Sequence, residues 1–261
     1  MRSLVRKIFK LLATLLKLMN PILRDIKEIE FNQIHYDKES DNNYKIKEGN
    51  IPILLSAPHG CKHLRNGKWK EEDEYTSSIA IKLGDLTGAH VIYVRNKTAE
   101  DSNYLIDTRY KDEIKKLVDE KGIRFVADIH GLDKDRPSKD KPSKVIVGII
   151  DEKDMKKCSC PGFKQIIEEC FKGFEEGLFN VGGYNAASQG TVTYFAKHIC
   201  NIEAAQFEIN AKYRIIKRKP DSSKAVQGVE PDFKANGKDI MDMFNHLKEM
   251  MLNIKEKIET K

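Results

Sequence analysis

The segment IPILLSAPHGC, residues Ile51–Cys61, and the segment RFVADIHG, residues Arg124–Gly131, share one pattern. Each is a run of apolar and β-branched residues that stops at a histidine followed by glycine, His59 in the first and His130 in the second. A short apolar run bounded by glycine or proline is typical of a buried strand. In an open α/β sheet, ligands bind beyond the carboxyl ends of such strands. The two segments therefore predict neighbouring strands that deliver two histidines to one pocket.

The rest of the chain alternates between strand and helix patterns. The predicted strands cover residues 51–56, 89–95, 123–129, 144–150, 191–194 and 204–209. The predicted helices cover residues 72–86, 111–120, 163–178 and 239–258. Residues 22–50 are polar and mixed, which indicates an edge hairpin or a lead-in segment. Strands alternating with helices imply an α/β fold with a mostly parallel sheet covered on both faces.

Length and composition indicate one globular domain. The chain has 261 residues, of which 33% are charged and 40% hydrophobic, and its net charge is +6. These values exclude a disordered chain and favour a single sizeable α/β domain, which we assign to residues 22–261. Nucleic-acid binding would need a clustered basic face with interleaved aromatic residues, and the sequence has none. We therefore expect no nucleic acid among the partners.

The cysteines indicate a reducing compartment. There are five of them, an odd number, and their spacing matches no disulfide framework. The pair at positions 158 and 160 lacks the second pair that a structural zinc site would need. Reduced thiols in a cytoplasmic protein are the expected state of Cys61, Cys158, Cys160, Cys170 and Cys200.

Residues 1–21 form a separate segment. Within residues 1–19, leucine, isoleucine and methionine fall on one helical face and arginine and lysine on the other, which predicts a basic amphipathic helix. This helix is too short and too often charged to span a bilayer, and no small-residue cleavage site follows it. Two interpretations stay open: the helix packs on the domain or on a second subunit of a homo-oligomer, or it lies on an anionic membrane surface. In the second case the cytoplasmic protein would be peripheral to the membrane.

The residues at the two strand ends suit a hydrolytic metal site. Such a zinc site needs three protein ligands and one open position for water. His59 and His130 are the best nitrogen donors, and Glu72 or Asp73, at the start of the following helix, is the candidate carboxylate. Asp73 is also a good N-cap for that helix. Glu208 lies in a strand-like run where a buried carboxylate is costly unless it lines a site, and a general base that deprotonates metal-bound water would fit there.

Each of these residues also has an ordinary structural interpretation. A strand-end histidine is usually just a hydrogen-bonded residue, an aspartate before a helix is usually a cap, and a glutamate in a strand usually faces outward. Composition and spacing alone therefore indicate a metallohydrolase only weakly.

The order of several short motifs along the chain strengthens the metallohydrolase interpretation. They are Ser56–Gly60 (SAPHG), Glu72-Asp73, Asp101–Asn103 (DSN), Asp128–Gly131 (DIHG) and Gln206–Asn210 (QFEIN) with Tyr213-Arg214.

This series resembles the N-formylglutamate amidohydrolase family, which is related in fold to the zinc carboxypeptidases. The matching blocks run from about residue 51 to residue 214 in the family's order. Each block is short, but five in sequence are fairly specific. The resemblance implies a three-layer α/β sandwich of the phosphorylase/hydrolase type with a mostly parallel, mixed central sheet. It also implies a single Zn²⁺ ion that activates water to cut the amide bond of an N-acyl amino acid, N-formyl included, or of a small peptide.

The resemblance further implies roles for individual residues. His59 and His130 match the family's histidine ligands, and Glu72-Asp73 matches the place of the acidic ligand. Glu72 is slightly favoured, because Asp73 is expected to cap the helix. Glu208 matches the catalytic glutamate, which takes a proton from water and hands it to the leaving amine.

Substrate binding is the part in which this chain departs from the family. Asn103 and Arg214 would hold the substrate, Arg214 through a bidentate grip on a carboxylate. Tyr104 stands where many members have an arginine, and Arg95 or Arg109 would supply the missing charge. The predicted partner is a small carboxylate-bearing amide.

The alternative to an enzyme is a non-catalytic binding or scaffold protein that keeps the fold and docks through its N-terminal helix.

Overall fold

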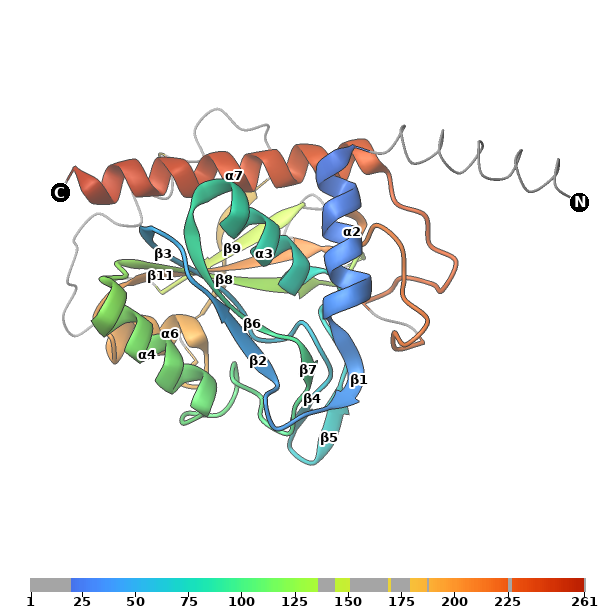
Figure 1. Cartoon of the computed structure of the whole chain (residues 1–261), viewed down its shortest axis with the longest axis horizontal. Helices are drawn as coiled ribbons and strands as arrows, with labels where there is room; N and C mark the ends of the chain where they lie inside the picture. The colour runs from blue at the N-terminus through green and yellow to red at the C-terminus, as the bar shows by residue number, and fades with distance from the viewer. Residues whose placement is uncertain are drawn as a thin grey trace, which may run out of the picture.

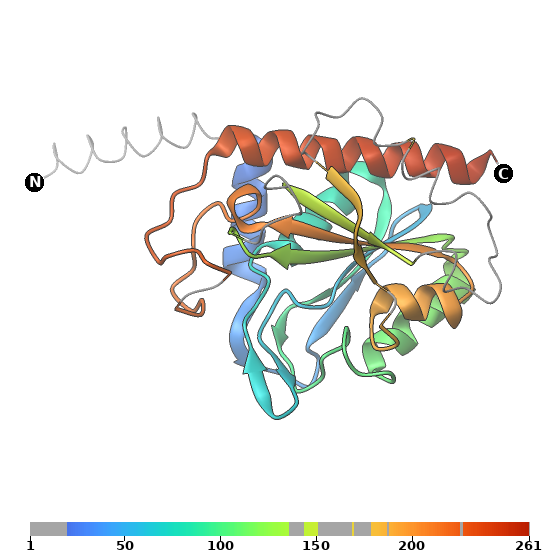
Figure 2. The same cartoon turned by 180° about the vertical axis from the view of Figure 1, so that it is seen from behind.

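The computed structural model describes residues 20–135, 144–150, 169, 179–186, 188–224 and 227–260. A seven-stranded sheet forms its middle layer (Figure 1). Helices α2 (Pro21–Gln33), α3 (Thr76–Thr87) and α7 (Gly237–Glu259) cover one face, and α4 (Arg109–Lys121) and α6 (Val192–His198) cover the other (Figure 2). The strands, in spatial order, are β10 (Phe179–Asn185), β9 (Val145–Ile149), β11 (Glu203–Asn210), β8 (Phe125–Leu132), β3 (Ile51–Ala57), β6 (Ala89–Val94) and β2 (Tyr44–Lys47).

The sheet is mixed and mostly parallel. Strand β3 pairs in parallel with β6 and β8, β8 pairs in parallel with β11, and β10 with β9. The antiparallel pairs are β2 with β6 and β9 with β11. Central parallel strands are buried on both faces and so consist of nearly continuous apolar runs, as β3 and β8 do. The predicted three-layer α/β sandwich is confirmed.

Two smaller sheets lie beside the central one. Strand β1 (His35–Glu39) pairs in parallel with β7 (Asn96–Lys97), and β4 (His63–Arg65) forms a hairpin with β5 (Lys68–Lys70). The turn of this hairpin is Asn66-Gly67, and both residues have positive φ, 52° and 71°. Asn-Gly is the pair that such a two-residue hairpin turn prefers.

Helix α7 carries a large share of the core. The predicted inward-facing residues of this helix are all buried: Ile240, Met243, Phe244, Leu247, Met251, Ile254 and Ile258. The helix packs on α3 and β3. Among the described residues, neither α7 nor any other helix is both long and apolar enough to cross a membrane.

The Phe244→Ala variant is expected to lose about 3–5 kcal/mol of unfolding free energy, because it removes a fully buried aromatic ring and leaves a cavity. Urea unfolding of the two proteins measures this difference. Leu252→Ala is the matched control on the same helix, since Leu252 is 39% exposed. Equal losses in the two variants would contradict the assignment of the buried face.

Three predicted elements differ from the structure. Residues 22–50 form helix α2 followed by β1 and β2, which pair with other strands and make no hairpin with each other. Pro21 opens α2, after Asn20 caps it through Oδ1 and the amide of Ile22 (2.9 Å). Residues 191–194 are the start of α6, where the Thr191 hydroxyl accepts a hydrogen bond from the Tyr194 amide (3.0 Å). The β-branched residues there favoured a strand, but the cap decides for a helix.

The third difference concerns the start of α3. The helix begins at Thr76, and its N-cap position is Tyr75, which has a left-handed backbone (φ 70°) and no side-chain cap. The prediction that Asp73 is the N-cap is therefore wrong. The predicted helices at residues 1–19 and 163–178 lie outside the described residues, apart from residue 169.

Candidate metal centre

The two strand-end histidines lie side by side. His59 lies just after β3, separated from its last residue by Pro58, and His130 is near the end of the adjacent parallel strand β8. Their ring centroids are 4.8 Å apart, the rings are nearly perpendicular, and both residues are buried. The predicted convergence of the two imidazoles at the carboxyl ends of neighbouring strands is confirmed.

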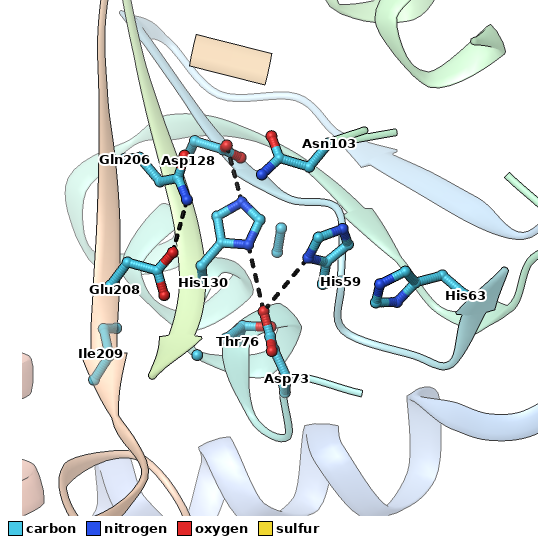
Figure 3. A network of polar contacts seen from close by, with 12 residues as sticks. His59, His63, Asp73, Thr76, Asn103, Asp128, His130, Gln206, Glu208 and Ile209 are labelled. Carbon is cyan, nitrogen blue, oxygen red and sulfur yellow. Dashed lines mark hydrogen bonds and ion pairs between the residues drawn. The ribbon is translucent and has the colours of Figure 1, made fainter. Parts of the chain in front are cut away.

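Asp73 completes the group (Figure 3). Its Oδ2 lies 3.3 Å from His130 Nδ1 and 3.7 Å from His59 Nδ1. One ligand atom from each of the three buried residues falls within 4.8 Å of the other two, so they could hold a metal ion. The backbone explains this position, because the amide of Asp73 donates to the carbonyl of His59 (2.8 Å) and the side chain is free of any capping role.

Glu72 points elsewhere. Its carboxylate is fully buried and accepts hydrogen bonds from the amide (2.7 Å) and the hydroxyl (2.9 Å) of Ser223. Of the two acidic candidates from the sequence, the structure brings only Asp73 to the histidines.

Each histidine is oriented by a further carboxylate. His59 Nε2 lies 2.8 Å from Asp101 Oδ1, and His130 Nε2 lies 2.9 Å from Asp128 Oδ2. Each carboxylate accepts a hydrogen bond from Nε2–H, which leaves Nδ1 of each ring directed at Asp73. Metal-binding histidines commonly have such an outer carboxylate, which sets their tautomer and ring orientation.

Asp101 and Asp128 lie in two of the short motifs of the sequence, but no role for their side chains follows from those motifs. Asp128 could have been recognised, since it stands two residues before His130 on the same face of a strand. It also accepts a hydrogen bond from the Ser56 hydroxyl (2.9 Å) on the neighbouring strand β3. Asp101 lies in a loop and reaches His59 across 42 residues of sequence, for which no local pattern exists.

The electrostatics favour a bound cation. Burial raises the pKa of Asp73, but the hydrogen bond from His130 and the charges of His59 and Arg214 outweigh it and hold that pKa well below its usual value. Burial lowers the pKa of His130, yet Asp128, Asp73 and Glu208 together raise it well above its usual value. The carboxylates on both sides of His130 therefore favour positive charge at this position, and a metal ion at Nδ1 would take the place of a proton.

Glu208 lies beside His130 on the next strand. In the parallel pair β8 and β11, Glu208 is in register with His130 and Gln206 with Asp128, so the four side chains share one face. Gln206 Nε2 donates to Glu208 Oε1 (2.7 Å), which leaves Oε2 free of this bond. Burial raises the pKa of Glu208, and the charge of His130 offsets part of that rise. A carboxyl with a raised pKa beside a metal ligand is suited to proton transfer.

Gln227 is a third residue whose role the sequence did not reveal. Its Nε2 donates to Asp73 Oδ1 (2.6 Å) and to the Gly131 carbonyl (2.9 Å). This bond occupies one oxygen of Asp73 and leaves Oδ2 toward the two histidines.

Arg214 is close to the site but enclosed. It is fully buried, its Nε donates to the Ile209 carbonyl (3.0 Å) and its Nη1 to the Glu74 carbonyl. Nη2 has no hydrogen-bond partner among the described residues and lies next to Gly131, where an added Cβ would approach it to 2.5 Å. Arg214 therefore ties β11 to the segment that carries Asp73.

Of the other predicted substrate-binding residues, one lies near the candidate metal centre and two do not. Asn103 lies near the group in Figure 3, with its Oδ1 accepting from the Val192 amide (2.8 Å). Arg109 is 62% exposed, pairs with Glu100 at 3.8 Å and lines a surface hollow with Trp69. Arg95 follows β6, and its backbone bonds to His35 and Asn43. The structure does not bring Arg95 or Arg109 to the histidines through any contact among the described residues.

Comparison with solved structures supports the fold. No family model and no curated protein matches the sequence. Gene product Atu2144 from Agrobacterium tumefaciens is similar in structure, with a TM-score of 0.55 and 11% identity over 83% of this chain and 96% of that one. This likeness shows a shared fold.

The weaker structural similarities include two proteins with TM-scores below 0.5. A metallo-carboxypeptidase from Pseudomonas aeruginosa has a TM-score of 0.43 and 12% identity, over 83% of this chain and 58% of that one. A succinylglutamate desuccinylase from Chromobacterium violaceum has a TM-score of 0.40 and 13% identity, over 79% of this chain and 63% of that one. This chain therefore spans less than two thirds of either protein.

Proposed function

We propose that this protein is a zinc-dependent amidohydrolase that cleaves the amide bond of an N-acyl amino acid, N-formyl included, or of a small peptide. The observation that carries the proposal is the convergence of His59 Nδ1, His130 Nδ1 and Asp73 Oδ2, with a carboxylate behind each histidine. Two histidines and one carboxylate are a ligand set of hydrolytic zinc enzymes, in which the fourth position is left for water.

The residues around this group support hydrolysis. Zinc, when bound by the three residues, would lower the pKa of a water molecule and polarise the substrate carbonyl. Glu208, beside His130 and held by Gln206, would accept a proton from the attacking water and donate it to the amide nitrogen as the bond breaks. Arg214 would keep Asp73 and β11 in place, and its free Nη2 would add positive charge near the developing oxyanion.

Metal analysis coupled to an activity screen tests the proposal. We expect the purified protein to carry about one zinc ion per chain and to release free amine from at least one member of a panel of N-acyl amino acids and dipeptides. A chelator should abolish this activity, and added zinc should restore it. A protein that binds zinc but turns over no substrate would favour the binding or scaffold alternative. A protein that binds no metal would contradict both the ligand set and the proposed chemistry.

The Asp101→Asn variant is expected to bind zinc about 10- to 100-fold more weakly, since an outer carboxylate orients a ligand without touching the metal. Asp101 is buried and its partner is His59 Nε2, so the amide would no longer fix the tautomer with Nδ1 unprotonated. Competition with a chromogenic chelator measures the affinity. Asp37→Asn is the control, because Asp37 forms only an exposed pair with Lys62. Unchanged affinity in Asp101→Asn would argue against His59 as a ligand through Nδ1.

A further inference from the structure

A second histidine lies flat against the ring of His59. His63 belongs to β4, in the hairpin that β4 forms with β5. The centroids of the two imidazole rings are 3.9 Å apart and their planes differ by 2°, so the rings stack face to face. Both residues are buried, and Figure 3 shows His63 on the side of His59 away from His130. His63 therefore covers one face of a candidate metal ligand.

His63 is held in this position by contacts of its own. Its Nδ1 lies 3.2 Å from the Cys61 carbonyl, to which it can donate a hydrogen bond. The backbone of β4 is attached to the residue that follows β7. The Leu64 amide donates to the Thr98 carbonyl (3.1 Å), and the Thr98 amide donates to the Lys62 carbonyl (3.0 Å). The backbone is therefore fixed on both sides of the stacked ring.

Stacking excludes His63 as a ligand of the same ion as His59. Ligand atoms of His59, His63 and Asp101 lie within 4.8 Å of one another, and Asp101 Oδ2 is 3.5 Å from His63 Nε2. The lone pair of an imidazole nitrogen lies in the plane of its ring, however, and one ion cannot lie in two parallel planes. Both oxygens of Asp101 also have partners, since Oδ1 holds His59 Nε2 and Oδ2 accepts from Arg65 Nε (2.5 Å). The stacked ring therefore acts on His59 itself.

His59 needs a restraint that Asp101 supplies only in part. A histidine ring turns about its Cβ–Cγ bond, a torsion with broad preferences. Nε2 lies closer to this axis than Nδ1 does, so a bond at Nε2 opposes the rotation less than a flat group packed on the ring face. Rotation would turn Nδ1 away from Asp73 Oδ2, which is 3.7 Å from it. Groups behind a metal ligand that fix its orientation contribute to metal affinity.

We propose that His63 is a positioning residue, which fixes the ring plane of His59 by stacking so that Nδ1 points at the metal position. The proposal rests on the metal centre of the proposed function and adds a residue to it. A ligand has to be held within about 10–20° of its productive orientation, and packing of supporting residues supplies that precision. A flat ring at position 63 should therefore matter more than the nitrogen atoms of that ring.

Metal affinity of three variants tests the proposal. His63→Ala is expected to bind zinc about 10- to 100-fold more weakly, the range for a residue behind a ligand. His63→Phe keeps a flat ring without nitrogen atoms and should recover most of the affinity. Leu64→Ala is the matched control and should bind zinc as the wild type does, because Leu64 is next on β4 and points to the other face. Competition with a chromogenic chelator measures the affinity, and the visible spectrum of the Co²⁺-loaded proteins reports the geometry at the metal.

Three results would overturn the assignment. Wild-type affinity and an unchanged Co²⁺ spectrum in His63→Ala would show that the metal site does not need the stacked ring. Equal losses in His63→Ala and Leu64→Ala would mean that the hairpin acts only through the fold, which unfolding midpoints of the metal-free proteins measure separately. Equal losses in His63→Ala and His63→Phe would assign the effect to the nitrogen atoms of His63.

Failure of the proposed function gives a different pattern. A wild-type protein that binds zinc without turning over substrate still reports on His63 through its metal affinity. A wild-type protein that binds no zinc contradicts the proposed function, and NMR of the metal-free protein then decides about His63. The Nε2–H signal of His59 should be sharp in the wild type and in Leu64→Ala, and broadened in His63→Ala, because the freed ring would leave Asp101. An equally sharp signal in His63→Ala would rule out the positioning role.

Discussion

The Asp73→Asn variant is expected to lose stoichiometric zinc, whereas Glu72→Gln is expected to keep it. Both changes replace a buried carboxylate by an amide of the same size, and the two residues are neighbours in sequence. Only Asp73 faces His59 and His130, while Glu72 bonds to Ser223. The loss in affinity for Asp73→Asn should exceed the about 10- to 100-fold expected for an outer-shell residue. Elemental analysis and chelator competition measure it.

Unfolding midpoints separate metal loss from misfolding. Asparagine keeps an oxygen that can accept the bond from Gln227, so Asp73→Asn should retain the fold. Glu72→Gln puts an amide where two donors from Ser223 now converge, so it should lower the unfolding midpoint but keep the fold and the zinc. A zinc-free Glu72→Gln beside a zinc-bound Asp73→Asn would reverse the ligand assignment.

The positions of His59 and His130 could be predicted because the physics there is local. A buried parallel strand has a sequence pattern, and its carboxyl end marks where a ligand can bind. Glu208 could be predicted for a related reason, since a carboxylate inside an apolar strand has to line a site or an edge. The strand register then places it beside His130.

The choice between Glu72 and Asp73 could not be made from the sequence. It depends on the backbone at Tyr75, whose φ of 70° is uncommon for a residue with a bulky side chain. That conformation delays the start of α3 to Thr76 and turns the Asp73 side chain toward the histidines instead of the helix end. A sequence pattern that reads aspartate as a cap has no access to this turn.

Long-range contacts explain the conformation before α3. Consecutive residues there bond to a later segment formed by residues 217–224 and Gln227, with sequence separations of 142 to 154 residues. The pairs are Glu72 with Ser223, Asp73 with Gln227, Glu74 with Arg218 and Tyr75 with Lys217. The acidic residues at 71–74 thus play two different structural roles. Asp73 faces the candidate metal position, and its neighbours attach the later segment.

Long-range contacts are also the reason that the sequence could not predict the positions of Asp101, Gln227 and Arg65. Each lies in a loop or a short hairpin and meets the site only in three dimensions. The family resemblance implies a missing positive charge at Tyr104, for which Arg95 and Arg109 are the candidates from the sequence. The guanidinium that the structure places over the Tyr104 ring belongs to Arg65. Nearness to Tyr104 in the sequence did not identify this arginine, because Arg65 lies much earlier in the chain, on β4.

The Glu208→Gln variant is expected to keep its zinc and to lose about 10²- to 10⁴-fold in kcat, the range that a positioned general base contributes. Glutamine has the size of glutamate and can still accept the bond from Gln206 Nε2, but it cannot take a proton from water. Because Glu208 lies beside His130 and is not part of the three-residue group, its charge is not needed to hold the metal. Zinc content and steady-state rates on the same preparations measure the two effects.

Glu208→Asp separates proton transfer from charge. It keeps a carboxylate but withdraws it by one methylene from the position that Gln206 now fixes, so kcat should fall less than in Glu208→Gln while zinc binding stays intact. If Glu208→Gln instead loses zinc, Glu208 belongs with His59, Asp73 and His130 in the ligand set, and another group must carry the proton. If it keeps both zinc and full activity, the carboxylate beside His130 only neutralises that histidine, and the hydrolytic mechanism proposed for this centre is wrong.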